Sequence, residues 1–465
     1  MKKWLPLLDS LSLGALILAM CSQVDVRRVG RDTLAEGLGY ATKTLAVALS
    51  DVVFLLVVLW FVARTIQTRG WKRLWWPPLP CFALIFVMIL SALHSAPIWA
   101  AVSASLAESG FGPRALITKE SKEAIAEIVQ WSAYFLVAPW LFANLMHDRR
   151  GEIFVSRRQL AIGVFSFAVL ASGLAAVAQG QNFVASAPRG FFASPNTYAA
   201  FLALALPLLL EVEVEEPRTQ IRFWMVAAAL IFVALSTVAS PWAIGAIGVG
   251  LVFAVLARVG GVKIKAFRLA IVVGLAIVTL GSWKTSRALE PFRSDFTRVG
   301  SPQRTVNGEV VPAQKVKKQL VEWAAALGWS VPRERAFATG VGPGNYQLNI
   351  GPLYNSLPNE EKMPPDSNNL YLVQAVSIGI LGLASLLWVV LHFWTLAWRA
   401  AKRNPADWLG AGVVGALSSW LFVNAFHALI VRGAGLVLAF LFALAVVAAQ
   451  TERNETADSS VEKPI

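Results

Sequence analysis

The stretch PPDSNNLYLVQ, residues 364 to 374, places four polar side chains directly before a long apolar run. Asp366 is the carboxylate of this stretch, and a carboxylate that is partly removed from water is a stronger base than one in water. Such a base takes the proton of an attacking hydroxyl as the new bond forms. The amides Asn368 and Asn369 allow two interpretations, because they either orient a hydroxyl or cap the helix that follows.

An arginine precedes another apolar run, SAPRGFFASPNTYAAFLALALPLLL, residues 186 to 210. Arg189 is followed by Gly190, which lets backbone approach closely, and Asn196 is expected a turn or so inside the apolar helix. A buried amide needs a partner, and a guanidinium holds phosphate in a bidentate fork. These residues together fit an anionic headgroup, whereas Arg189 alone fits an interfacial anchor.

Basic residues outnumber acidic ones between residues 284 and 318. As a cluster beside Arg189, four of these side chains fit a pyrophosphate, although each one alone fits a solvated charged surface: Arg287, Arg293, Arg298 and Arg304. The segment GVGPGNY, residues 340 to 346, has no Gly-Lys-Ser/Thr sequence after its glycines. It therefore predicts a tight turn more strongly than a phosphate cradle.

The remaining candidates for chemistry are isolated in the sequence. His94 and His427 lie near the outer ends of predicted helices and are substitute candidates for the base, although simple hydrogen bonding explains either one. Cys21 and Cys81 lie in or beside apolar runs and form no disulfide framework. No Ser-His-Asp spacing and no metal-ligand spacing occurs, so the sequence predicts no metal and no cofactor.

Composition places all these residues in a membrane protein. The chain has 465 residues, of which 56% are hydrophobic and only 15% charged. Soluble domains are less apolar, whereas repeated spans of about 20 apolar residues produce such values. The net charge of +13 is explained by basic cytoplasmic loops, since no nucleic-acid-binding motif occurs.

The apolar runs predict an all-α polytopic protein with about twelve transmembrane helices. They cover residues 4–21, 45–64, 76–94, 124–146, 160–178, 191–210, 223–239, 241–257, 267–283, 370–395, 408–427 and 433–450. The loops that alternation assigns to the inside are all basic, so both termini are expected in the cytoplasm. Amphipathic helices are expected at 119–130, lying along the interface, and at 319–327.

This pattern predicts four regions. Residues 1–283 hold helices 1–9, residues 284–369 form a large outer loop with short helices, residues 370–450 hold helices 10–12, and residues 451–465 form a disordered tail. The outer loop is far longer than a connection between neighbouring helices needs.

The motifs resemble the O-antigen ligase and O-antigen polymerase superfamily. The matching pieces are PRGFFASPNTYAAFLALALPLLL, VEWAAAL followed by TGVGPGNY, DSNNLYLVQAVSIGILGL, and NAFHALI, in the family's order. The resemblance covers residues 180–450, and the N-terminal third matches by hydropathy alone. It implies a bacterial inner-membrane protein with about twelve spans and a large periplasmic loop between helices 9 and 10, which forms the active face.

The resemblance also implies an activity. Family members move a glycan from an undecaprenyl-pyrophosphate carrier onto the hydroxyl of an acceptor saccharide, such as lipid A-core in lipopolysaccharide biosynthesis or a growing polysaccharide, without a metal. It implies Asp366 and Asn368 as catalytic residues and Asn196 and Asn369 as supporting ones. The pyrophosphate of the donor would be bound by four basic residues: Arg189, Arg287, Arg293 and Lys318.

The chain departs from the family pattern at several positions. Asp366 and Asn368 stand where many members have the histidines of His-x-His-Asn, Gln319 stands where an arginine is common, and Ser240-Pro241 replaces Ser-Arg. These departures leave three interpretations: a ligase or polymerase that uses Asp366 as base, a relative with another polysaccharide acceptor, or a non-catalytic relative. Outside glycan transfer, the alternatives are a transporter of a small anion such as bicarbonate and a membrane scaffold.

Overall fold

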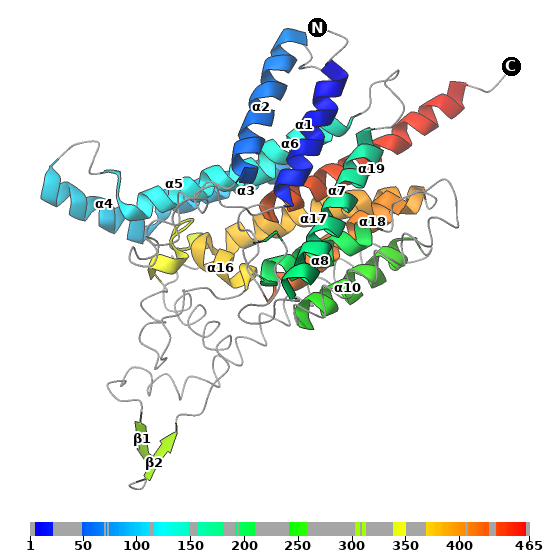
Figure 1. Ribbon diagram of the computed structural model, residues 1–465. Coiled ribbons are helices and arrows are strands. Elements are labelled where there is room, and N and C mark those ends of the chain that lie inside the picture. Colours follow the sequence, from blue (N-terminus) through cyan, green and yellow to red (C-terminus); the bar gives the residue numbers. More distant parts are fainter. Residues whose placement is uncertain are drawn as a thin grey trace.

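The computed structural model of the protein describes residues 5–21, 49–68, 71, 74–110, 116–147, 157–180, 191–192, 195–209, 241–258, 303–306, 309–312, 338–349, 369–404, 408–426 and 434–461. The regular secondary structure of this part is helical apart from one short ribbon of two strands (Figure 1). The expected helix at 319–327 and the expected spans 223–239 and 267–283 lie outside these residues. At every other expected span the structure places a helix.

The helices of the first half are α1 (Leu5–Met20), α2 (Leu49–Thr68), α3 (Leu79–His94), α4 (Ala96–Ser109), α5 (Lys119–Ser132), the π-helical turn η6 (Ala133–Val137), α6 (Ala138–Met146), α7 (Arg157–Gly180), α8 (Pro195–Leu209) and α10 (Pro241–Arg258). Those of the second half are α16 (Leu370–Ser377), α17 (Gly379–Arg403), α18 (Trp408–Val423) and α19 (Ala434–Val461). Strands β1 (Gln303–Val306) and β2 (Glu309–Pro312) pair antiparallel.

Several of these helices are long and apolar enough to cross a membrane. Four described helices meet that test, and they cover 49–68, 119–146, 157–176 and 379–403. The pair α3 and α4 becomes a fifth if it is counted as one span bent by 47°. Helices α1, α8, α10, α18 and α19 contain shorter apolar segments. The chain is therefore a helical membrane protein by length and composition.

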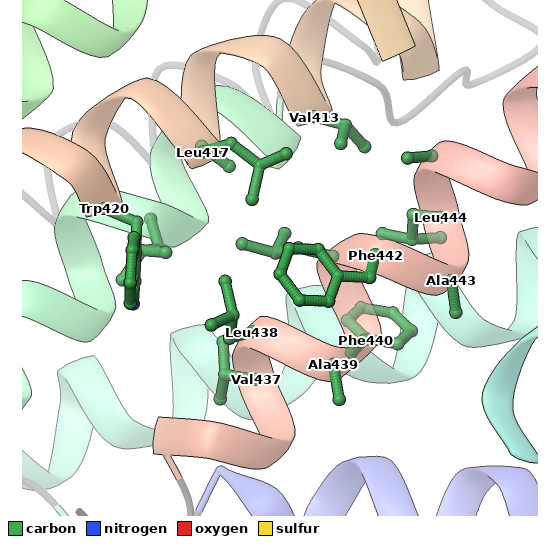
Figure 2. Packing of buried hydrophobic residues seen from close by; sticks show 14 of the residues in the cluster. Val413, Leu417, Trp420, Val437, Leu438, Ala439, Phe440, Phe442, Ala443 and Leu444 are labelled. Carbon is green, nitrogen blue, oxygen red and sulfur yellow. The ribbon is translucent and has the colours of Figure 1, made fainter. Parts of the chain in front are cut away.

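The core of the bundle lies around α18 and α19. Helix α18 is buried on all sides over most of its length, and α19 is buried from residue 435 to residue 448, which is typical of helices that are apolar all round. Figure 2 shows Leu417 and Trp420 of α18 facing Leu438 and Phe442 of α19. The Phe442 ring also stacks on Phe393 of α17, with ring centroids 4.3 Å apart.

Small residues bring α8, α10 and α18 into close contact. A Cβ atom built on Gly250 of α10 would lie 2.1 Å from the Ser419 Oγ and 2.8 Å from the Gly415 carbonyl oxygen of α18. The Ser419 hydroxyl donates to the Ala246 carbonyl oxygen at 2.8 Å. Membrane helices commonly associate through such small residues, because apolar lipid provides no hydrophobic drive for helix association.

The structure differs from the expected arrangement at 119–130. This segment does not form a separate interfacial helix, because α5 continues through η6 into α6 as one span from Lys119 to Met146. Figure 1 shows α5 and α6 in line. The wider π turn ends at Val137, two residues before Pro139, which has no N–H for the helical ladder.

Three further elements differ from the sequence-based expectation. Helix α4 follows α3 in what was expected to be loop, and α19 continues to Val461 through the segment expected to be a disordered tail. The long loop, for which only short helices were expected, holds the β1–β2 ribbon, in which Val306 pairs with Glu309. Asn-Gly, the dipeptide between them in the sequence, is the local signal for such a hairpin.

A buried ion cluster joins α1, α2 and α7. The Asp9 side chain in α1 is fully buried, and its Oδ2 lies 2.8 Å from Arg64 Nη1 and 3.3 Å from Arg157 Nη1. Arg157 also donates to the Leu145 carbonyl oxygen at 3.4 Å. Charges inside a membrane bundle are costly unless they are paired in this way.

Candidate functional site

Most of the predicted site residues lie outside the part of the chain that the structure describes. These are Asp366, Asn368, Arg189, Arg287, Arg293 and Lys318. Their roles therefore stay predictions. Asn196 is described by its backbone only: α8 begins at Pro195, so Asn196 lies in the first helical turn and not a turn further inside. Proline favours this first position because its missing N–H has no helical partner there.

Asn369 caps α16, the helix that follows the predicted catalytic stretch. Its Oδ1 accepts the backbone N–H groups of Tyr371 at 3.0 Å and Leu372 at 3.2 Å, so the capping interpretation is confirmed. The Leu370 N–H donates to the Asn424 carbonyl oxygen at 2.9 Å, and the Tyr371 hydroxyl donates to the Leu421 carbonyl oxygen at 2.5 Å. The start of α16 is thereby fixed against the end of α18.

The glycine turn, Gly340–Tyr346, packs against the other end of α16. Gly340, Gly342 and Gly344 all have positive φ angles, 74°, 100° and 72°, which only glycine adopts without strain. The N–H groups of Val341 and Gly342 donate to the carbonyl oxygens of Val376 and Ser377 at 2.9 and 2.8 Å. The prediction of a tight turn at this segment is therefore confirmed.

Two helix breaks meet at the glycine turn. Helices α16 and α17 are separated at Ile378, and a Cβ atom on Gly379 would lie 2.1 Å from the carbonyl oxygen of Ala338. Helices α3 and α4 are separated at Ser95, whose hydroxyl donates to the Val341 carbonyl oxygen. Backbone carbonyls freed by a break need new donors, and the glycine turn supplies two of them.

Glu127 of α5 faces the same turn. Its carboxylate accepts the Gly344 backbone N–H and the side-chain amide of Gln374 in α16. The contact is close, since a Cβ atom on Gly344 would lie 3.1 Å from Glu127 Oε2. The Asn345 Nδ2 donates to the carbonyl oxygens of Glu120 and Pro343, each at 3.2 Å. Glu127, Asn345, Gln374 and Ser377 are called the glycine-turn cluster below.

The cluster is not suited to binding phosphate. The N–H groups of Val341, Gly342, Gly344 and Asn345 all have partners within the protein. A carboxylate also stands at the turn, and it would repel a phosphate group. The phosphate-cradle interpretation of GVGPGNY is therefore not supported by the geometry.

Sequence reasoning did not find Glu127 and Gln374. Glu120, Glu123 and Glu127 recur at helical spacing and share one face of α5, within the segment that was expected to be an amphipathic helix along the interface. Gln374 is an amide within an apolar run and is 2% exposed. A buried amide in a membrane helix is costly unless it is hydrogen-bonded. The presence of Gln374 in an apolar run was therefore the one sequence signal that pointed to a polar partner at this place.

His94 forms a hydrogen bond within its own helix, α3. The Nδ1 of His94 lies 2.9 Å from the carbonyl oxygen of Leu90, and the ring is exposed. A carbonyl only accepts, so Nδ1 carries the proton and donates. The simple hydrogen-bonding interpretation of His94 is therefore confirmed, and His427 lies outside the described residues. Among the residues that the structure describes, no three His, Cys, Asp or Glu side chains are grouped to hold a metal ion.

Comparison with known proteins does not add a family to these observations: no protein-family model and no curated protein matches the sequence.

Proposed function

We propose that the protein transfers a glycan from an undecaprenyl-pyrophosphate carrier to the hydroxyl of an acceptor saccharide, as O-antigen ligases and polymerases do. The acceptor is lipid A-core or a growing polysaccharide. The proposal includes about twelve spans in the bacterial inner membrane and a periplasmic active face that contains residues 284–369.

One observation carries the proposal. TGVGPGNY and DSNNLYLVQAVSIGILGL, two of the pieces on which the family resemblance rests, pack directly together through the hydrogen bonds from Val341 to Val376 and from Gly342 to Ser377. The second piece begins with Asp366, three residues before the cap Asn369. The two pieces therefore meet at the C-terminal end of α16, while Asp366 precedes its N-terminal end, and this supports a common site built around that short helix.

The chemistry assigns a role to each predicted residue. Asp366 takes the proton of the acceptor hydroxyl while its oxygen bonds to the anomeric carbon of the donor sugar. The bond from that carbon to the pyrophosphate oxygen breaks, and the lipid pyrophosphate leaves with the electron pair. Four cations stabilise the leaving charge through charge-assisted hydrogen bonds: Arg189, Arg287, Arg293 and Lys318.

A transporter is the second candidate, because of the two helix breaks. Discontinuous helices at a binding site are typical of secondary transporters, and the breaks at Ser95 and Ile378 both contact the glycine turn. The Glu127 carboxylate at that turn argues against an anion such as bicarbonate at this place. Glycan transfer is therefore the better-supported proposal.

Deletion of the gene tests the proposal in the cell. The expected result is loss of a surface glycan together with accumulation of its undecaprenyl-pyrophosphate-linked precursor, and both changes should be reversed by the wild-type gene. Unchanged surface glycans and unchanged lipid-linked precursors would contradict glycan transfer. Altered uptake of a small anion in the same strain would favour the transporter.

A further inference from the structure

The glycine-turn cluster holds buried oxygen atoms with unused bonding capacity. Among the described residues, three of these atoms are buried and have no hydrogen-bond partner: Asn345 Oδ1, Gln374 Oε1 and Ser377 Oγ. Their residues are 0%, 2% and 1% exposed. A buried polar atom without a partner destabilises the fold, so three of them on two segments that pack together indicate that something bonds to them.

The identity of the amide oxygens follows from their neighbours. The Gln374 side chain meets a carboxylate, which only accepts, so Gln374 presents its NH₂ group to Glu127. The Asn345 NH₂ group likewise donates to the carbonyl oxygens of Glu120 and Pro343. Both amides therefore keep their oxygens for another partner. Gln374 and Ser377 are three residues apart on α16, so they share one face.

The missing partner must also suit the local charge. Glu127 is partly buried, and the charged side chain that acts on it among the described residues is another carboxylate, Glu123. Lys119, one turn earlier in α5, acts on Glu123. When Glu127 is ionised, the cluster therefore carries one negative charge that no described cation is placed to neutralise. A water molecule would satisfy the oxygens but would not balance this charge.

We propose that the glycine-turn cluster binds one monovalent metal cation, Na⁺, through the Glu127 carboxylate and the side-chain oxygens of Asn345, Gln374 and Ser377. One carboxylate among neutral oxygens matches a single positive charge, whereas Ca²⁺ sites commonly draw on several carboxylates. Na⁺ sites in membrane proteins occur at helix breaks of this kind. The ion links α5, the glycine turn and α16, and the proposal does not depend on glycan transfer.

The thermal stability of the full-length protein in detergent tests this site. The protein is purified in choline chloride, and NaCl replaces choline at constant ionic strength, with KCl as a parallel series. The unfolding midpoint should rise saturably with Na⁺, by a few degrees at about one hundred times the dissociation constant. The rise should be smaller in KCl. In the Glu127→Gln variant the Na⁺ response should disappear.

The matched control is Glu108→Gln, which removes an exposed carboxylate from α4 and should keep the full Na⁺ response. If Glu127→Gln does not fold, equilibrium binding of radioactive sodium to the wild-type protein decides the question, and binding of one ion per chain is expected. No sodium binding, or an equal Na⁺ response in Glu127→Gln, would overturn the proposal. Stabilisation by acid without any Na⁺ response would assign the site to a proton instead and would also overturn it.

Discussion

Asp9 shows how one buried carboxylate can hold three helices. It lies between Arg64 and Arg157, at 2.8 and 3.3 Å, and all three side chains are at most 7% exposed. The desolvation of two guanidinium groups is offset by the carboxylate between them. Removing one member of a buried ion pair destabilises a protein much more than replacing the whole pair by apolar residues does, because the remaining charge is left uncompensated.

The Asp9→Asn variant should therefore lose about 3–5 kcal/mol of stability. Thermal denaturation in detergent measures this loss. The double variant Asp9→Asn/Arg64→Met restores the original charge balance of the cluster and should regain part of the loss, as a positive coupling in a double-mutant cycle. Equal stability of Asp9→Asn and wild type would show that the ion cluster is not formed.

Asp366 carries the residue-scale prediction for catalysis. A positioned base contributes about 10²–10⁴-fold to such a reaction, so Asp366→Asn should reduce glycan transfer by at least that lower factor without loss of expression. Asp366→His should retain activity, because it restores the residue that the resembling family has at this place. Loss of activity in His94→Ala together with normal activity in Asp366→Asn would contradict the role of Asp366 as base. This result is not expected, because the His94 Nδ1 is already hydrogen-bonded to the Leu90 carbonyl oxygen.

Close packing of α10 against α18 gives the element-scale prediction. A Cβ atom on Gly250 would meet the Ser419 hydroxyl and the Gly415 backbone, whereas one on Gly248 would meet nothing within 4 Å. Gly250→Ala should therefore destabilise the protein by about 1–3 kcal/mol through overpacking. Gly248→Ala in the same helix should leave stability unchanged or slightly higher. Equal unfolding midpoints of the two variants would contradict the helix contact.

At the scale of elements, the sequence predicts the positions of helices better than their interruptions. Apolar length is a local property, so the predicted runs coincide with helices wherever the structure describes them. The break at Ile378 is different, because it is stabilised by N–H groups of Val341 and Gly342, which are distant in the sequence. Propensity alone does not reveal such a long-range partner.

The candidate site shows the same limit. The cap at Asn369 and the turn at Gly340–Gly344 were predictable, since capping and positive φ depend on residue type. The meeting of Glu127 with Gln374 was not, because the helical pattern of α5 shows which residues share a face but not what packs against that face. Among the basic residues assigned to pyrophosphate, Arg304 lies in β1 with only its backbone described. The others lie outside the described residues, and the roles of all of them stay predictions.

At the scale of the whole molecule, contacts between helix ends agree with the alternation of inside and outside loops. Asn144 Oδ1 accepts the Trp75 N–H at 2.9 Å, and the Arg258 guanidinium lies 3.3 Å from the centroid of the Trp408 ring. All four residues lie at ends assigned to the cytoplasm. Leu370 and Asn424, which bond at 2.9 Å, both lie at ends assigned to the periplasm.

Labelling of single cysteines tests this orientation. A cysteine at Asn307, within the long loop, should react from the periplasm with a thiol reagent that does not cross the membrane. A cysteine at Asn404, where α17 ends, should react only after the membrane is opened. Both native cysteines are buried, so they should contribute little background. Labelling of Asn404 alone in intact cells would contradict the topology.

The most direct test of glycan transfer is turnover by the purified protein in liposomes, with an undecaprenyl-pyrophosphate-linked glycan and an acceptor saccharide, measured as release of undecaprenyl pyrophosphate. The wild-type protein should release it in step with glycosylated acceptor. Arg189→Ala should reduce the rate at least tenfold, because one charge-assisted bond contributes about 1.5–3 kcal/mol, and Arg189→Lys should restore little of it, since an ammonium cannot form the bidentate fork. No release by the folded wild-type protein, or a full rate in Arg189→Ala, would contradict the account.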